Sequence, residues 1–257
     1  MDALKGVTIA VDRGEYVAVV GGNGSGKTTL AKHLNGLLRP TGGHVYVLGQ
    51  EASSRTVAEL ARVVGYVFQN PDHQLFCRTV QDEVSFGPAN MGLGEDEVRA
   101  RADRAIEVMG LSEVRGAPPL SLPLGIRRRV SVASVIAMEP QVLVLDEPTT
   151  GLDAREAADL MAIVRRLNDA GSTIVLITHE MKLVAEHVNR VLVMADGRVV
   201  LDSDTRGAFS DLELLRRSNL LPPPVTQLAH KLSQIGVSRD VLTPEELVFE
   251  ITRGDGP

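Results

Sequence analysis

The sequence contains no tryptophan and few other aromatic residues, with three tyrosines and five phenylalanines among 257 residues. Because 44% of the residues are nevertheless hydrophobic, a folded core must consist mainly of valine, leucine, isoleucine and alanine. The single cysteine, Cys77, cannot form a disulfide bond within the chain. This cysteine usage is typical of a reducing compartment.

Long apolar runs and an excess of positive charge are also missing. No stretch approaches the ~18 consecutive apolar residues of a membrane-spanning helix, and Met1–Lys5 lacks the apolar segment of a signal peptide. The formal net charge of −6 argues against nucleic-acid binding as the main function. We therefore predict a soluble protein with one sizeable α/β domain and small appendages, able to dock on a membrane protein.

A glycine-rich stretch, 21–28, fits the phosphate-binding pattern G-x-x-x-x-G-K-[ST]. The apolar run 16–20 before it predicts a buried strand, and 29–34 after it predicts a helix. Glycines let backbone N–H groups surround an anion, Lys27 is expected to reach the β- and γ-phosphates, and Thr28 to bind Mg²⁺. The alternative, a flexible glycine-rich turn, does not explain the strand-loop-helix context. The predicted nucleotide-binding residues are Gly21, Gly22, Asn23, Gly24, Ser25, Gly26, Lys27, Thr28 and Thr29.

Acidic residues follow a second buried strand. The apolar run 142–145 leads into Asp146 and Glu147, which places one carboxylate at the edge of a parallel sheet where Mg²⁺ and phosphate bind. Glu147 is expected to orient or deprotonate water. His179 ends the next predicted strand, 173–177, and we expect it to contact the γ-phosphate. A purely structural histidine at the strand end is the alternative.

The order of the predicted elements indicates an α/β fold. Strands and helices alternate up to residue 70 and again from 139, whereas helical periods such as 95–109 and 127–138 dominate between them. We predict a P-loop (RecA-like), mostly parallel sheet core with an antiparallel part, an inserted helical subdomain and a small C-terminal helical extension. The alternation over 4–11 indicates a further strand. The predicted boundaries are 1–70 and 139–217 for the core, 71–138 for the helical subdomain and 218–257 for the extension.

The C-terminal extension follows a break at 222–224, three consecutive prolines. Apolar residues then recur at helical spacing, and Thr243 and Glu246 flank Pro244 in a pattern typical of a capped helix start. We interpret the extension as a candidate dimerisation element with one apolar face. The alternative is a helix that folds back onto its own core. The residues at helical spacing are Val225, Leu228, Leu232 and Ile235.

These motifs together resemble the ATP-binding-cassette (ABC) ATPases over about residues 4–215. The resemblance implies ATP and Mg²⁺ as cofactors and identifies Gln69 as the Q-loop glutamine, which binds the metal with Thr28 and Asp146. It implies that Glu147 is the catalytic residue and His179 the switch histidine. It also identifies 150–153 as the end of the D-loop.

A closer resemblance comes from the strings 68–76, 79–80 and 86–88, with support from 32–38. They are similar to the ATPase subunits of energy-coupling-factor transporters, which import vitamins and cobalt or nickel ions. This implies a peripheral protein on the cytoplasmic face of the membrane, paired with a second ATPase subunit. The pair would drive a transmembrane coupling protein that carries a separate substrate-binding membrane subunit. Phe76 is expected to contact the coupling protein, with core packing as the alternative.

One motif departs from the family. Family spacing aligns 122–126 with the signature Leu-Ser-Gly-Gly-Gln, whereas a start at Leu120 would require two extra residues. Pro123 has neither a hydroxyl nor an N–H group, and Leu124 has a side chain where bare backbone is expected. Losing one such donor can cost ~3 kcal/mol of transition-state stabilisation. We therefore expect one of two composite ATP sites to be impaired, and a heterodimer with a partner that has an intact signature.

The N-terminus also departs from the family, whose members usually have an adenine-stacking aromatic residue further upstream. Here the phosphate loop already starts at Gly21, and Tyr16 is expected in the core. We expect that the start has been assigned too late; the alternative is that adenine is held without stacking. Two other functions remain open. A non-transport ABC ATPase usually has a coiled-coil insertion or tandem cassettes, and a regulatory subunit would bind ATP without hydrolysing it.

Overall fold

The computed structural model describes residues 2–253. These residues form two compact units. The first comprises 2–11, 15–29 and 176–253, and the second comprises 12–14 and 30–175. These limits do not coincide with the domain boundaries expected from the sequence, which stay a prediction.

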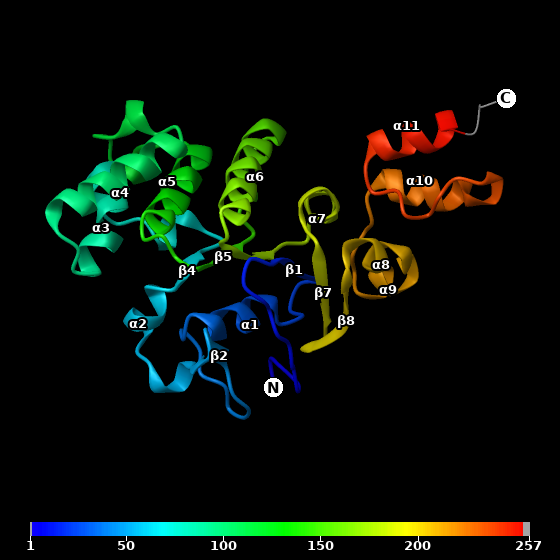
Figure 1. Cartoon of the computed structure of the whole chain (residues 1–257), viewed down its shortest axis with the longest axis horizontal. Coiled ribbons are helices and arrows are strands. Elements are labelled where there is room, and N and C mark those ends of the chain that lie inside the picture. Colours follow the sequence, from blue (N-terminus) through cyan, green and yellow to red (C-terminus); the bar gives the residue numbers. More distant parts are fainter. Residues whose placement is uncertain (1, 254–257) are drawn as a thin grey trace. The chain divides into compact units, whose positions relative to one another are not determined.

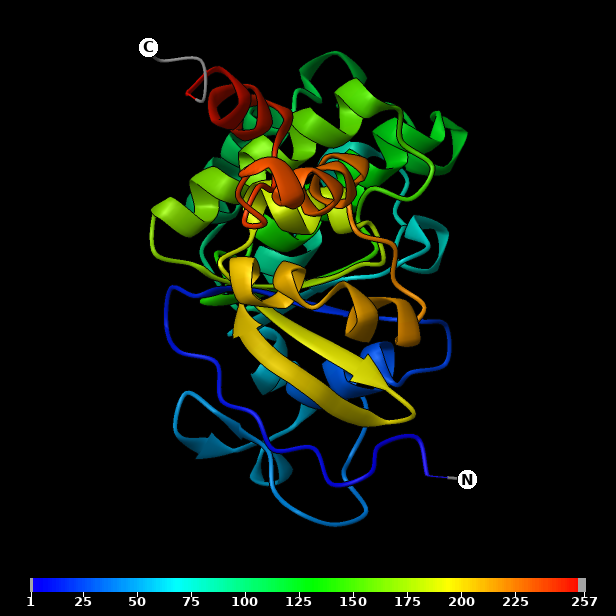
Figure 2. The same ribbon diagram turned by 90° about the vertical axis from the view of Figure 1, so that its right-hand side faces the viewer.

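The strands of the first unit combine parallel and antiparallel pairing. β1 (Tyr16–Gly21) pairs in parallel with β7 (Arg190–Ala195), which pairs antiparallel with β8 (Arg198–Asp204). The chain passes from the second unit to the first within β6 (Thr173–Ile177). β1 is buried along its whole length, whereas alternate residues of β8 are exposed, as expected for an antiparallel edge strand. Figure 2 shows β7 and β8 side by side.

No strand forms over residues 2–15, so the strand expected at 4–11 is wrong. This segment is held by isolated contacts with the β7–β8 hairpin instead of by a ladder. The Lys5 N–H donates to the Gly197 carbonyl over 2.7 Å, and Arg198 donates to the Lys5 carbonyl over 3.1 Å. The alternation of apolar and polar residues over 4–11 therefore goes with partial burial of the segment, not with pairing as a strand.

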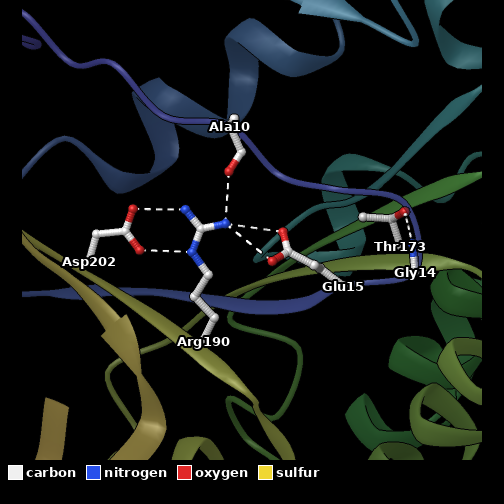
Figure 3. Close-up of polar contacts among 6 residues, drawn as sticks. All are labelled: Ala10, Gly14, Glu15, Thr173, Arg190 and Asp202. Atoms are coloured by element: carbon white, nitrogen blue, oxygen red, sulfur yellow. Dashed lines mark hydrogen bonds and ion pairs between the residues drawn. The ribbon is translucent and has the colours of Figure 1, made fainter. Parts of the chain in front are cut away.

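Arg190 joins this segment to the hairpin (Figure 3). Its guanidinium donates to both carboxylate oxygens of Asp202 over 2.7 and 2.8 Å, and to the Ala10 carbonyl over 2.8 Å. It also forms an ion pair with Glu15, with 3.1 Å between Nη1 and Oε2. The hydrogen bond to Asp202, with the charges of Asp202 and Glu15, raises the pKa of Arg190 above its usual value.

The second unit contains a parallel strand pair and three packed helices. β4 (Val64–Val67) pairs with β5 (Val142–Asp146), which neighbours β6. α3 (Val80–Asn90), α4 (Glu95–Val108) and α5 (Leu124–Ile136) pack against one another (Figure 1). The helices expected at 95–109 and 127–138 are confirmed, although α5 begins three residues earlier. The Gly14 N–H donates to Thr173 Oγ1 over 2.9 Å within this unit (Figure 3).

The remaining elements are short or locally capped. α6 (Ala154–Asp169) begins with a capping box, in which Asp153 and Glu156 each accept the other's main-chain N–H. β2 (Tyr46–Val47) and β3 (Gln50–Glu51) form a short antiparallel pair. Further helices are α1 (Lys27–Leu34), α2 (Val57–Ala61), α7 (Met181–His187), α8 (Thr205–Ser210) and α9 (Leu212–Arg217), and the 3₁₀ segments are Ala52–Ser54, Pro71–His73, Ser112–Val114, Pro119–Ser121 and Ser233–Ile235.

The C-terminal extension contains α10 (Pro224–Leu232) and α11 (Pro244–Arg253), with a small apolar cluster of its own. As expected, the Thr243 hydroxyl accepts the Glu246 N–H, over 3.3 Å, at the start of α11. The Glu246 carboxylate accepts from Leu242 N–H over 2.7 Å. Within residues 2–253, no helix combines the length and apolar character needed to cross a membrane. The cluster consists of Ala229, Val237, Val241 and Leu247, with Val225 and Leu232 packed against it.

Candidate functional site

The phosphate loop lies between β1 and α1 in the first unit, as its sequence context predicts. The backbone needs glycine at several of its positions. Gly21 has a φ of 153°, and a Cβ there would lie 2.2 Å from the main-chain oxygen of Met194 on β7. Gly24 and Gly26 have φ values of 78° and 102°, which side chains rarely tolerate. The loop conformation therefore excludes alanine at its first position.

Polar groups converge on this loop. The Lys27 ammonium is nearly buried and donates to the carbonyls of Gly21, over 2.8 Å, and Gly22, over 3.0 Å. Ser25 is only 6% exposed, and its hydroxyl has no hydrogen-bond partner within the described residues. A buried hydroxyl without a partner is unfavourable unless a ligand satisfies it. The loop thus offers both a cation and a hydroxyl to a phosphate group.

A polar cavity of about 150 Å³ borders the loop. Its walls come from the loop residues 22–25, from the end of β7 and its turn at 194–196, and from 217–219 at the end of α9. Asn219 has a φ of 58° and packs close to Gly22. The sequence did not predict that Asn219 lines this cavity, because it lies almost two hundred residues from the loop in the chain. Its one local signal is that it is a polar residue just after a helix.

His179 belongs to the same unit as the phosphate loop. It follows β6, and its side chain is exposed. The neighbouring backbone is fixed, since Thr178 N–H donates to the Val19 carbonyl over 3.3 Å and the Thr178 hydroxyl accepts from Glu180 N–H over 3.0 Å. Its expected contact with a γ-phosphate stays a prediction.

Asp146 ends β5 in the second unit and is 3% exposed. The Tyr66 hydroxyl donates to its Oδ2 over 2.8 Å from the neighbouring strand β4. Burial and the adjacent carboxylate raise the pKa of Tyr66 well above its usual value, so the phenol stays a donor. The sequence gives no signal of this contact, because Tyr66 and Asp146 are 80 residues apart.

Glu147 is 7% exposed and has a φ of 48°. A residue other than glycine in the left-handed region costs of order 1 kcal/mol or more and is found disproportionately at functional sites. Its carbonyl accepts from Thr150 N–H over 3.3 Å, which starts the turn towards α6. The backbone at Glu147 is therefore strained, and the role of its buried carboxylate as a base stays a prediction.

Gln69 lies in the second unit on the segment that follows β4, and its side chain is exposed. The predicted metal ligands, Thr28 of the first unit with Gln69 and Asp146 of the second, all offer oxygen atoms. Oxygen donors with one carboxylate suit Mg²⁺, which usually completes its shell with phosphates and water. Residues 2–253 contain no group of three or more His, Cys, Asp or Glu side chains arranged to hold a metal. The chemistry of these three side chains suits Mg²⁺, and their assembly into one site stays a prediction.

The signature region has no polar cap. Helix α5 begins at Leu124 after Pro123, and no side chain caps its first N–H groups. Ser121 lies three residues before the helix, and its hydroxyl donates to the Pro118 carbonyl over 2.8 Å. A Cβ at Gly125 would lie 2.2 Å from Glu156 Oε1, so a carboxylate of the same unit lies beside this helix start. The alignment of 122–126 with the signature stays a prediction.

The segment after Gln69 presents aromatic side chains. Phe76 is 63% exposed and forms an edge-to-face pair with Phe86, at 4.8 Å between ring centroids. The buried Glu83 carboxylate accepts the N–H groups of Phe76 and Cys77 over 2.8 and 2.7 Å. Core packing of Phe76 is therefore wrong, and the ring is available to a partner.

Comparison with known proteins agrees with these features. The family model for ABC transporters matches residues 4–150. The energy-coupling factor transporter ATP-binding protein EcfA of Methanoculleus marisnigri is 45% identical over 93% of this chain and 87% of its own length. A relative from Caldanaerobacter subterraneus subsp. tengcongensis is 44% identical over 96% of this chain, but the chain spans only 42% of that protein.

Among solved structures, cbiO1 from Clostridium perfringens, part of the ABC transporter complex cbiONQ, has a TM-score of 0.75 and 38% identity. The match covers 90% of this chain and 92% of that one. The fold is therefore that of an ABC cassette. By motif, geometry and likeness, the chain belongs to the ABC transporter family and, within it, to the ATP-binding subunits of energy-coupling factor transporters.

Proposed function

We propose that this chain binds ATP with Mg²⁺ and hydrolyses it to drive an importer of a vitamin or a transition metal ion. It would act as a peripheral subunit on the cytoplasmic face of the membrane. A transmembrane coupling protein and a substrate-binding membrane subunit would complete the transporter. No nucleic acid is expected among its partners.

The observation that carries the proposal is the phosphate loop. Its backbone conformation requires glycine at the first position, and Lys27 donates hydrogen bonds to the carbonyls of Gly21 and Gly22. The buried Ser25 hydroxyl needs a ligand as its partner. Backbone N–H groups at the start of α1 add the positive end of a helix dipole. Together these groups favour a bound polyphosphate.

Each predicted site residue has a defined task. Lys27 would neutralise charge on the transferred phosphate, and the loop from Gly21 to Thr29 would hold the phosphate chain. Mg²⁺, when bound, would screen the charge between phosphates; Thr28, Gln69 and Asp146 would hold it. Glu147 would accept a proton from the attacking water, and His179 would contact the γ-phosphate. Glu147 is suited to its task because its carboxylate directly follows a buried strand end.

Replacing Glu147 with glutamine tests the proposal. Turnover should fall about 100-fold or more, since a general base typically contributes that much, while affinity for a fluorescent ATP analogue stays near that of the wild type. Glu107→Gln on α4 is the matched control, because Glu107 is an exposed glutamate on a helix of the second unit. Undiminished hydrolysis by Glu147→Gln would remove Glu147 from this role.

A second ATPase subunit is part of the proposal, and a heterodimer is favoured. The start of α5 lacks the hydroxyl and bare backbone that a partner's γ-phosphate would need, and Leu124 packs where a Cβ at Gly151 would lie. The chain would thus complete a site that has an intact signature on the other subunit. The C-terminal extension offers a surface for this pairing, with exposed apolar side chains at Leu221, Leu228, Ile235, Val248, Phe249 and Ile251.

A regulatory subunit that binds ATP without turnover is the second candidate. The uncapped signature helix favours it. The two candidates differ in the assembled transporter: if this chain is catalytic, its Glu147→Gln variant abolishes transport-coupled hydrolysis. If it is regulatory, only the corresponding change in its partner does so.

A further inference from the structure

One arginine in the second unit is buried without an ion pair. Arg128 lies on α5, is 1% exposed, and is among the largest fully buried side chains of the chain. Within residues 2–253 no carboxylate forms an ion pair with it, and its Nε has no hydrogen-bond partner. A buried charge without a carboxylate partner is costly, so its retention calls for a compensating role.

The guanidinium of Arg128 binds main-chain oxygens at two places. Nη1 donates to the Phe68 carbonyl over 2.9 Å, and Nη2 donates to the Gln69 carbonyl over 2.6 Å. Nη2 also lies 3.3 Å from the Thr150 carbonyl. Gln69 is the predicted metal ligand, and Thr150 lies on the turn that begins at Glu147. The planar guanidinium therefore contacts two backbone segments, the one that contains Gln69 and the turn that follows Glu147.

The rest of the Gln69 segment is also held by α5. The Gln74 side chain donates to the Ser131 carbonyl over 2.8 Å and accepts from the Ser131 hydroxyl over 2.7 Å. Arg127 forms an ion pair with Asp72, with 2.6 Å between Nη1 and Oδ1. These contacts hold residues 68–74 against α5 at several points, and the one from Arg128 reaches Gln69 itself.

We propose that Arg128 is a positioning residue, which sets the backbone of Gln69 and of the turn after Glu147 from helix α5. It acts through the carbonyl groups of Phe68, Gln69 and Thr150 and not through the nucleotide or the metal. The inference rests on the proposed function, because Gln69 matters only if it binds Mg²⁺ with the nucleotide. Replacing Arg128 would remove the donor to all three carbonyls and loosen the backbone at Gln69.

The charge of Arg128 supports this placement. Burial lowers its pKa, whereas the negative charges of Asp146 and Asp72 oppose that shift. The same negative charges stabilise a guanidinium close to the end of β5. A neutral replacement of similar length would lose the donors to these carbonyls.

The test measures how Mg²⁺ changes the binding of a fluorescent ATP analogue to the full-length chain. For Arg128→Gln, the tightening of binding by Mg²⁺ should fall about 10-fold, as is usual when a group that orients a metal ligand is lost. Binding in EDTA should stay within twofold of the wild type, because the phosphate loop is unaltered. Arg129→Gln is the matched control; it removes the same charge one residue further along, where Arg129 lies 3.6 Å from Asp159.

Arg128→Lys keeps the charge but loses the planar fork, so it should fold and show an intermediate loss. If Arg128→Lys, or a folded Arg128→Gln, responds to Mg²⁺ as the wild type does, the positioning role is wrong. If the wild type itself does not bind the analogue, or Mg²⁺ leaves its affinity unchanged, the proposed function fails instead.

Discussion

The Tyr66 hydroxyl donates to Asp146 Oδ2 over 2.8 Å, and both groups are buried in neighbouring parallel strands. A hydrogen bond to a buried carboxylate fixes its orientation. Tyr66 therefore helps to orient the Asp146 carboxylate, which is a Mg²⁺ ligand in the proposed function.

Tyr66→Phe should weaken the Mg²⁺-dependent part of nucleotide binding about 10-fold, because the carboxylate loses the donor that orients it. Binding in EDTA should be unaffected. Titration of a fluorescent ATP analogue with and without Mg²⁺ measures both quantities. Tyr46→Phe provides the control, since Tyr46 is 63% exposed. Equal responses of the two variants would show that the contact has no influence on the metal.

Gly21→Ala should abolish nucleotide binding. The new Cβ would lie 2.2 Å from the Met194 carbonyl at a φ of 153°, so the start of the loop would have to move. Gly42→Ala is the control, because nothing lies within 4 Å of a Cβ at Gly42. Isothermal titration with ATP and circular dichroism separate loss of binding from unfolding. Near-normal ATP affinity of Gly21→Ala would contradict the loop conformation.

Arg190→Gln should lower the free energy of unfolding by about 2 kcal/mol, because its charged hydrogen bonds to Asp202, Glu15 and the Ala10 carbonyl are lost together. Urea denaturation measures the change. Arg198→Gln removes only the donor to the Lys5 carbonyl and should cost about 0.5 kcal/mol. A smaller loss for Arg190→Gln than for Arg198→Gln would contradict this ranking.

Acid should destabilise the protein partly through Asp202. The hydrogen bond and charge of Arg190 hold the pKa of Asp202 below its usual value. The contribution to stability is therefore complete above the unfolded-state pKa of about 4, and it is lost as pH falls through the lower folded-state pKa. Urea midpoints between about pH 5 and pH 2 should fall less steeply in Arg190→Gln. Parallel curves for the two proteins would rule out this pair as a cause.

Restoring the signature tests the assigned register. Pro123→Ser combined with Leu124→Gly should raise ATP turnover of the purified chain about 10-fold or more, since a single donor to transition-state charge can contribute that much. The control is Leu122→Gly with Pro123→Gly, which builds the motif in the competing register from Leu120. If ATP turnover rises only in the control variant, the signature begins at Leu120 and the register assigned here is wrong.

Local signals predicted much of the fold. The strand at 173–177 agrees residue for residue, and the helix expected at 95–109 is one residue shorter. Both segments combine a strong apolar period with clear boundaries, so neighbouring residues decide the structure. By contrast, alternation at 4–11 did not produce a strand, because its groups are bound by Gly197 and by arginine side chains far along the chain.

The candidate site was predictable where the chain itself brings residues together. The phosphate loop and the pair of Asp146 and Glu147 are contiguous motifs. Their neighbours in the sequence place the first between a strand and a helix and the second at a strand end. Tyr66 and Arg128 were not predictable, because their partners lie 80 and 59–60 residues away. Neither residue type indicates such a contact in a buried strand or helix.

Glu156 has two neighbours that share its carboxylate: the Asp153 N–H that it caps, over 3.1 Å, and the bare backbone of Gly125. Any side chain at 125 would displace the cap and loosen the start of α6. Substitutions at 125 and 156 should therefore be tolerated only as a pair, because the start of α5 and the cap of α6 share one carboxylate.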